Sequence, residues 1–132
     1  MLGDFLGDMQ QRQIHIDFIS GAWSEHFLHL LNYRPQDSYT LILASETIYS
    51  PTTLRPFTTL LMHLLMYIGS GRSNSRALIA AKKMYFGVGG GVDEFLQLVA
   101  SMGGEAREVF AAGKEGQGVA RVVLEVLRSQ DS

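Results

Sequence analysis

The apolar residues of this chain alternate between runs typical of strands and spacings typical of helices. From Ile14 to Phe18 apolar and polar residues take turns, which is the period-2 pattern of a strand. Leu41–Ala44 and Ala77–Ala81 are short continuous apolar runs, which favour strands buried on both faces. Three strands are therefore predicted before the last third of the chain.

Helical spacing is clearest between the second and third of these strands. One helical face is formed there by Phe57, Leu60, Leu61, Leu64, Leu65 and Ile68. We expect Thr53 to cap this helix, because Pro56 would then fall in the first turn, where its missing N–H costs no intrahelical bond. Gly69 and Gly71 would end the helix.

Two further helices and a hairpin complete the pattern. Ser24 can cap a short helix, and a second helix runs from Val92 to Met102 before two glycines stop it. Glu105–Phe110 and Val119–Arg128 predict two final strands joined by a hairpin-like connection. Strands that alternate with helices imply an α/β domain with a mostly parallel sheet covered on both faces, and the hairpin would add an antiparallel edge.

Composition narrows the class of protein. The 132 residues suit one domain, and 46% apolar and 18% charged residues are typical of a globular chain. The net charge of -2 predicts no general attraction to nucleic acid or to anionic membranes. The chain has no secretory signal and no apolar stretch long enough to span a bilayer, so we expect an intracellular protein of the cytoplasm or nucleus. It has no cysteine, so cysteine usage does not indicate the compartment.

Ligands of open α/β sheets bind at the carboxyl ends of the strands, which directs attention to three segments. Glu46 and Tyr49 follow the Leu41 strand; they could hold a polar substrate, or be a solvated loop residue and a packing aromatic. Trp23 could cover a flat ligand or pack in the core. The glycine-rich turn Gly87–Gly91 lacks the pattern of a phosphate loop or of a dinucleotide fingerprint.

No metal site is predicted. His26 and His29 are three apart on a predicted helix, but a metal ion needs more ligands than these, and the sequence offers no converging set. His63 lies between core positions of its helix and is expected to flank the core.

Two of these strand-end segments resemble a known family. Ser45-Glu-Thr-Ile-Tyr49 and Tyr85-Phe-Gly-Val-Gly-Gly-Gly91 are similar to runs of the histidine protein methyltransferases, and the resemblance extends from about Ile14 to Arg128. These are class I, seven-strand methyltransferases that use S-adenosylmethionine to modify a histidine of a large-subunit ribosomal protein. The resemblance implies a Rossmann-like methyltransferase sheet with a terminal antiparallel hairpin, a protein substrate, and no direct contact with nucleic acid, membrane or metal.

The resemblance also implies roles for individual residues. Glu46 would hold the target imidazole in the right tautomer and Tyr49 would shape the target pocket. The cofactor would lie against Gly21, Trp23, Ala44 and Ser45. The substrate-side loop would contain Tyr85, Phe86, Gly87, Gly89 and Gly90. Where many relatives carry an acidic residue before the tryptophan, this chain has Ala22.

The resemblance further implies a partial domain. The family holds the cofactor on a glycine-rich loop after its first strand and on an acidic residue after its second, and only thirteen residues precede Ile14. Residues 1–132 would then supply strands three to seven, with the first two strands missing. The Ile14 strand would then either detach or pair with the Leu41 strand. Two alternatives stay open on the sequence: a catalytically silent fragment that serves as an interaction module, and a related methyltransferase that acts on lysine.

Overall fold

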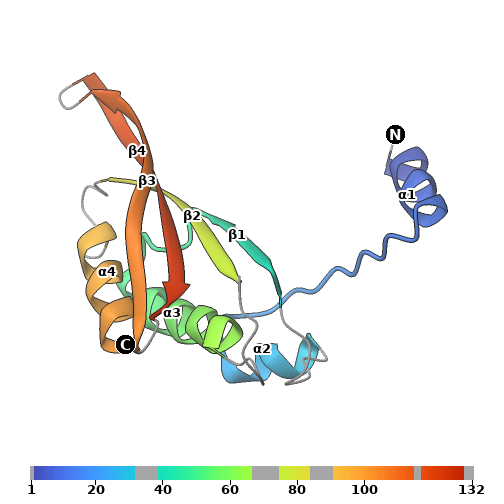
Figure 1. Cartoon of the computed structure of the whole chain (residues 1–132), viewed down its shortest axis with the longest axis horizontal. Helices are drawn as coiled ribbons and strands as arrows, with labels where there is room; N and C mark the ends of the chain where they lie inside the picture. Colours follow the sequence, from blue (N-terminus) through green and yellow to red (C-terminus); the bar gives the residue numbers. More distant parts are fainter. Residues whose placement is uncertain (1, 32–38, 67–74, 84–90, 115–116, 130–132) are drawn as a thin grey trace.

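Four strands form one mixed sheet in the order β1-β2-β4-β3 (Figure 1). The computed structural model describes residues 2–31, 39–66, 75–83, 91–114 and 117–129. Along the chain the elements are α1 (Leu2–Gln11), α2 (Glu25–Leu30), β1 (Leu41–Ser45), α3 (Pro51–Met66), β2 (Arg76–Lys82), α4 (Val92–Ser101), β3 (Gly104–Lys114) and β4 (Gln117–Arg128). The fold class is α/β, as the sequence predicts.

The sheet contains one parallel pair and two antiparallel pairs. β1 runs parallel to β2, with Leu43 opposite Leu78. β4 is antiparallel to both of its neighbours, with Leu124 opposite Ile79 on β2. β3 and β4 form the predicted terminal hairpin, so the antiparallel edge is confirmed. The expectation of a mostly parallel sheet is wrong, because β4 enters between β2 and β3 in the opposite direction.

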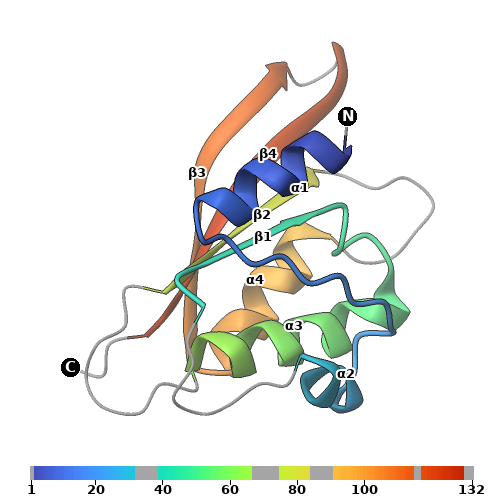
Figure 2. The same ribbon diagram turned by 90° about the vertical axis from the view of Figure 1, so that its right-hand side faces the viewer.

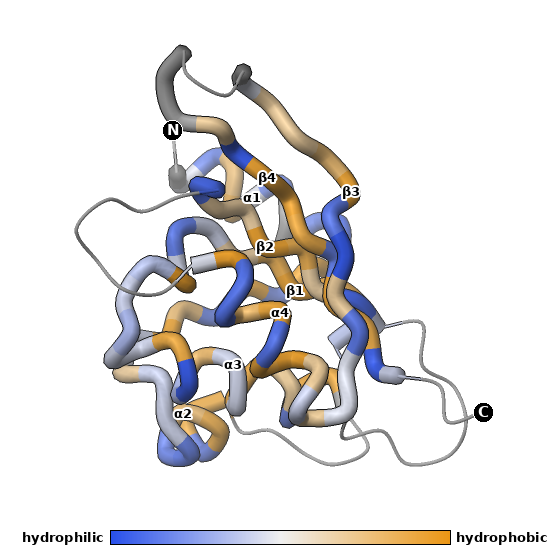
Figure 3. The backbone as a smooth tube through the Cα atoms, turned by 90° about the vertical axis from the view of Figure 1, so that its left-hand side faces the viewer, coloured by the Kyte–Doolittle hydropathy of each residue, from blue (hydrophilic) through white to orange (hydrophobic). Residues whose placement is uncertain are grey.

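Helices α3 and α4 cover one face of the sheet (Figures 1 and 3). Alternate residues of β2 point to that face, which gives this strand the period-2 burial of a sheet packed on one side, and Val122, Leu124 and Val126 of β4 are buried there as well. The core is completed by the apolar stripes of the two helices. Its fully buried side chains include Leu54, Leu61, Leu65, Ile79, Phe95, Val99, Leu124 and Val126.

No described helix packs on the opposite face, so the predicted coverage of both faces is wrong for the described part of the chain. Leu41 is 46% exposed and Leu43 69% exposed, although their run predicted a strand buried on both sides. In Figure 1, α1 stands apart from the sheet at the end of an extended segment.

An ion-pair cluster lies on this open face. Glu125 of β4 is only 7% exposed and accepts hydrogen bonds from Arg107 Nε and Nη2 at 3.1 and 2.9 Å, and from Arg76 Nη1 at 3.3 Å. Arg107 comes from β3 and Arg76 from β2, so three neighbouring strands meet in the cluster. The hydrogen bonds from Arg107, with the charges of both guanidinium groups, lower the pKa of Glu125 from 4.5, although burial acts to raise it.

The structure corrects one prediction near the amino-terminal end and adds a helix there. Ile14–Phe18 forms no strand; the segment is exposed, and Phe18 is 80% exposed. A strand requires a partner for its backbone hydrogen bonds, and no described strand pairs with this segment. The helix α1, in contrast, was not predicted.

The start of α3 also differs from the prediction. The Ser50 carbonyl accepts the N–H groups of Thr53 and Leu54 at 3.2 and 2.9 Å, so Ser50 and not Thr53 stands at the cap. Pro51 is then the first helical residue, where its fixed φ suits a helix. Pro56 lies inside the helix rather than in its first turn.

Among the described residues, no helix is long and apolar enough to cross a membrane.

Candidate active site

The first part of the site is the point where β1 ends beside β2. Because the two strands are parallel, their carboxyl ends share one edge of the sheet, with Ser45 opposite Ala80 as the last pair. The Glu46 N–H donates to the Ala80 carbonyl at 3.0 Å, which ties the next residue to the neighbouring strand. Glu46 is therefore held at the sheet edge by a backbone bond as well as by chain continuity.

Glu46 also has an unusual backbone conformation. Its φ of 56° lies in the left-handed region, which residues with a Cβ adopt rarely. Such a conformation costs on the order of 1–3 kcal/mol and persists only where surrounding contacts impose it; these residues cluster at functional sites. The turn aims the Glu46 side chain away from the direction in which a continuing strand would carry it.

The Glu46 carboxylate meets a cation from a strand that is not its neighbour. Glu46 Oε1 lies 3.7 Å from Arg121 Nη1, and the two side chains are 40% and 63% exposed. Arg121 belongs to β4, where it stands opposite Lys82 of β2. Sequence reasoning did not find Arg121, because no local spacing relates it to Glu46.

The residues around Glu46 differ in burial. Ile48 is fully buried in the core and anchors the turn, whereas Tyr49 is 48% exposed and Ser45 is exposed. Thr47 Oγ1 is buried and has no hydrogen-bond partner among the described residues. A buried hydroxyl without a partner is unfavourable, and this one lies in the turn that follows β1.

Trp23 lies in a cluster of aromatic rings. Its ring centroid is 5.6 Å from that of Phe27 and 5.4 Å from that of Phe57, both in edge-to-face arrangements. Phe57 in turn lies 6.5 Å from Phe95 in the core. Gly21 packs closely under α2, where an added Cβ would meet side chains of Phe27 and Leu30 at 3.2 Å.

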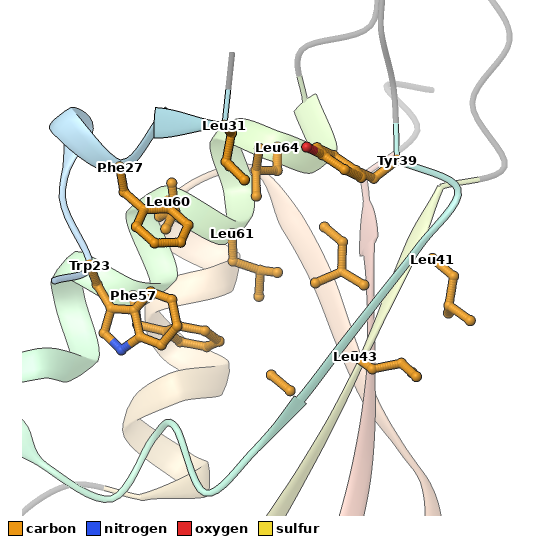
Figure 4. Close-up of a pocket in the computed structure, with 12 residues that line it drawn as sticks. Trp23, Phe27, Leu31, Tyr39, Leu41, Leu43, Phe57, Leu60, Leu61 and Leu64 are labelled. Atoms are coloured by element: carbon orange, nitrogen blue, oxygen red, sulfur yellow. The ribbon is translucent and has the colours of Figure 1, made fainter. Parts of the chain in front are cut away.

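A cavity of about 240 Å³ opens between β1, α2 and α3 (Figure 4). Trp23 and Ala44 both line it, so the structure brings together two of the four residues predicted to bind the cofactor. Gly21 and Ser45 are not among its described lining residues. The wall consists of apolar side chains together with Tyr39; in Figure 4, Trp23 and Phe57 lie together at one end, and Leu41 and Leu43 point away from it.

The chemistry of the residues that line this cavity can be compared with the groups of S-adenosylmethionine. Apolar and aromatic side chains suit a flat ring such as adenine, but the described lining residues offer no carboxylate or amide for a ribose or an amino acid group. The described residues therefore fit parts of the cofactor, and its remaining polar groups would need other partners.

The predicted substrate-side loop cannot be placed. Tyr85, Phe86, Gly87, Gly89 and Gly90 lie outside the described residues. Gly91, the last glycine of that run, precedes α4 with a φ of 137°. In the described part of the chain, no three His, Asp or Glu side chains come together as a metal site would require.

Comparison with known proteins identifies the family. No family model matches the chain. Histidine protein methyltransferase 1 of Schizosaccharomyces pombe is 32% identical over 125 residues, which is 94% of this chain and 34% of the relative. The protein of the same name in Saccharomyces cerevisiae is 37% identical over 98 residues, covering 72% of this chain and 25% of the relative.

A mammalian protein is similar to this chain as well. The Histidine protein methyltransferase 1 homolog of Bos taurus is 40% identical over 94 residues, covering 70% of this chain and 22% of the relative. The mixed α/β sheet with its hairpin is consistent with a partial class I methyltransferase fold. The chain belongs to the histidine protein methyltransferase family, and it spans about a third or less of the length of these curated relatives.

Proposed function

We propose that this chain forms the target-histidine side of a protein-histidine methyltransferase that uses S-adenosylmethionine. The observation that carries the proposal is the placement of Glu46 in a chain of this family: its carboxylate leaves the shared carboxyl edge of two parallel strands from a left-handed turn. This is the edge at which open α/β sheets bind their ligands. The kinship to proteins named histidine protein methyltransferase supplies the reaction class.

The role of Glu46 follows from the chemistry of imidazole. A neutral imidazole has one nitrogen that carries hydrogen and one that carries a lone pair. A carboxylate that accepts a hydrogen bond from the first nitrogen fixes the tautomer and presents the second nitrogen to an electrophile. Because the Glu46 side chain is 40% exposed, it can also pass the proton lost after alkylation to water.

The other residues of the site would bind and orient the cofactor and the target histidine. When bound, S-adenosylmethionine supplies an electrophilic methyl group on a sulfonium. Ala44 and Ser45 would lie against the cofactor through their backbone, and Trp23 would lie near its adenine. Tyr49, which is half exposed beside the Glu46 turn, would form a wall of the histidine pocket. We further propose a histidine of a large-subunit ribosomal protein as the target, and the cytoplasm or nucleus as the location.

A methylation assay tests the proposal. The chain is incubated with S-adenosylmethionine and purified large ribosomal subunits, and the modified residue is identified by mass spectrometry. Methyl transfer to a histidine supports the proposal. Transfer to a lysine, or no transfer with a bound cofactor detected by calorimetry, contradicts it in favour of the lysine enzyme or of an interaction module.

Glu46→Gln tests the assigned role. A glutamine keeps the shape but offers a weaker acceptor, so we expect kcat to fall by about 100-fold or more. Glu108→Gln is the matched control, because Glu108 is an exposed carboxylate on β3. Equal rates for the two variants would contradict a catalytic role for Glu46.

A further inference from the structure

Arg121 is the cation that meets the proposed catalytic carboxylate, and it does so across an intervening strand. The sheet order places β2 between β1 and β4 (Figures 1 and 2). Neighbouring strands are about 4.8 Å apart, so the Glu46 and Arg121 backbones lie roughly two such spacings from one another. Both side chains must extend toward each other for Oε1 and Nη1 to come within 3.7 Å. The contact thus restricts the rotamers of Glu46.

The charges around this contact favour the same arrangement. Arg121 and Lys82 stand directly opposite each other on β4 and β2, and like charges in that position repel. A carboxylate near Arg121 offsets this repulsion, and Glu46 is the carboxylate that the structure places there. The backbone bond to Ala80 fixes where the Glu46 side chain starts, and Arg121 attracts its carboxylate toward β4.

Such an exposed ion pair contributes little to folding stability. Arg121 is 63% exposed and the charged atoms are 3.7 Å apart, a geometry in which solvent screens most of the attraction. An attraction this weak biases the Glu46 carboxylate toward Arg121 without fixing it. Orientation matters in a methyl transfer, because the imidazole nitrogen must be aligned with the sulfonium carbon.

We propose that Arg121 is a positioning residue that holds the Glu46 carboxylate toward the target imidazole, an inference that rests on the proposed function of Glu46. Arg121 touches neither the substrate nor the cofactor in this role. It acts only through Glu46, and this makes the proposal testable with double variants.

The kinetic test compares Arg121→Met, Arg121→Lys, Glu46→Gln and the double variant Glu46→Gln/Arg121→Met in the methylation assay. We expect Arg121→Met to lower kcat by roughly 2- to 5-fold with little change in KM, and Arg121→Lys to restore part of the loss. The double variant should be no slower than Glu46→Gln alone. Arg128→Met, at an exposed arginine of the same strand, is the matched control and should leave kcat unchanged.

A full additional loss in the double variant would overturn the proposal, as would an equal loss in Arg128→Met. A second readout does not depend on activity. The side-chain NMR signals of Glu46 in the 132-residue chain should shift in Arg121→Met and not in Arg128→Met. If the unmodified protein transfers no methyl group, the proposed function fails, and the NMR comparison alone decides whether Arg121 orients Glu46; unchanged Glu46 signals would overturn the inference.

Discussion

The two faces of the sheet carry similar apolar residues, which are buried on one face and exposed on the other. On the face covered by α3 and α4, Ile79 and Leu124 have no exposed surface at all. On the opposite face Leu43 is 69% exposed, although it belongs to an equally apolar run. The difference teaches that an apolar run specifies a strand, whereas its burial depends on what packs against it.

Phe95→Ala should have the largest effect on folding stability. Phe95 is fully buried between α4 and the sheet, so truncation removes a large apolar side chain and leaves a cavity. We expect the free energy of unfolding to fall by about 3–5 kcal/mol in urea denaturation. Leu43→Ala on the open face should change it by less than about 0.5 kcal/mol. Similar losses in the two variants would mean that the open face is covered in solution.

Gly104→Ala should be the next most disruptive change. Gly104 begins β3 beneath both helices, and an added Cβ would lie 2.5 Å from Met62 Cε and 2.8 Å from Val99 Cγ1. Overpacking of this kind costs about 1–3 kcal/mol of unfolding free energy. Gly7→Ala serves as the control, since nothing lies within 4 Å of its added Cβ. A neutral Gly104→Ala would show that the helices have room to move off the sheet.

Glu125→Gln should produce the smallest effect, and one that depends on pH. Arg107 and Arg76 lower the pKa of Glu125 in the folded protein, so its ionised form contributes stability above the ordinary value of 4.5. That contribution is lost as the pH falls through the lowered pKa. The unfolding midpoints of the variant and the unmodified protein should therefore differ at neutral pH and converge in acid. A constant difference at all pH values would contradict the assigned cause.

The elements that were predicted correctly have local signals. The Ala77 run and the helix beginning at Val92 appear within a residue or two of their predicted bounds. Gly103 adopts a φ of 82° just after α4, which is the conformation that makes glycine a common helix stop. Composition and periodicity alone were enough for these parts of the fold.

The failures involve partners that periodicity does not reveal. Ile14–Phe18 has the alternation of a strand but no described neighbour to pair with. The apolar spacing of α1 at Leu2, Phe5, Leu6 and Met9 was available, but Gly3 and Gly7 inside it disfavour a helix and obscured the signal. At the site, the position of Glu46 was predicted from its strand end, whereas its contact with Arg121 depends on the order of strands in the sheet.

The strand order also determines when the sheet can be completed during synthesis on the ribosome. β4 joins β2 to β3, yet it is the last of the four strands to be translated. A nascent chain that has released β1, β2 and β3 still lacks the strand that links the third to the other two. Val122, Leu124 and Val126 reach the core only with β4, so the hydrophobic side of the nascent sheet stays open to chaperones until that segment emerges.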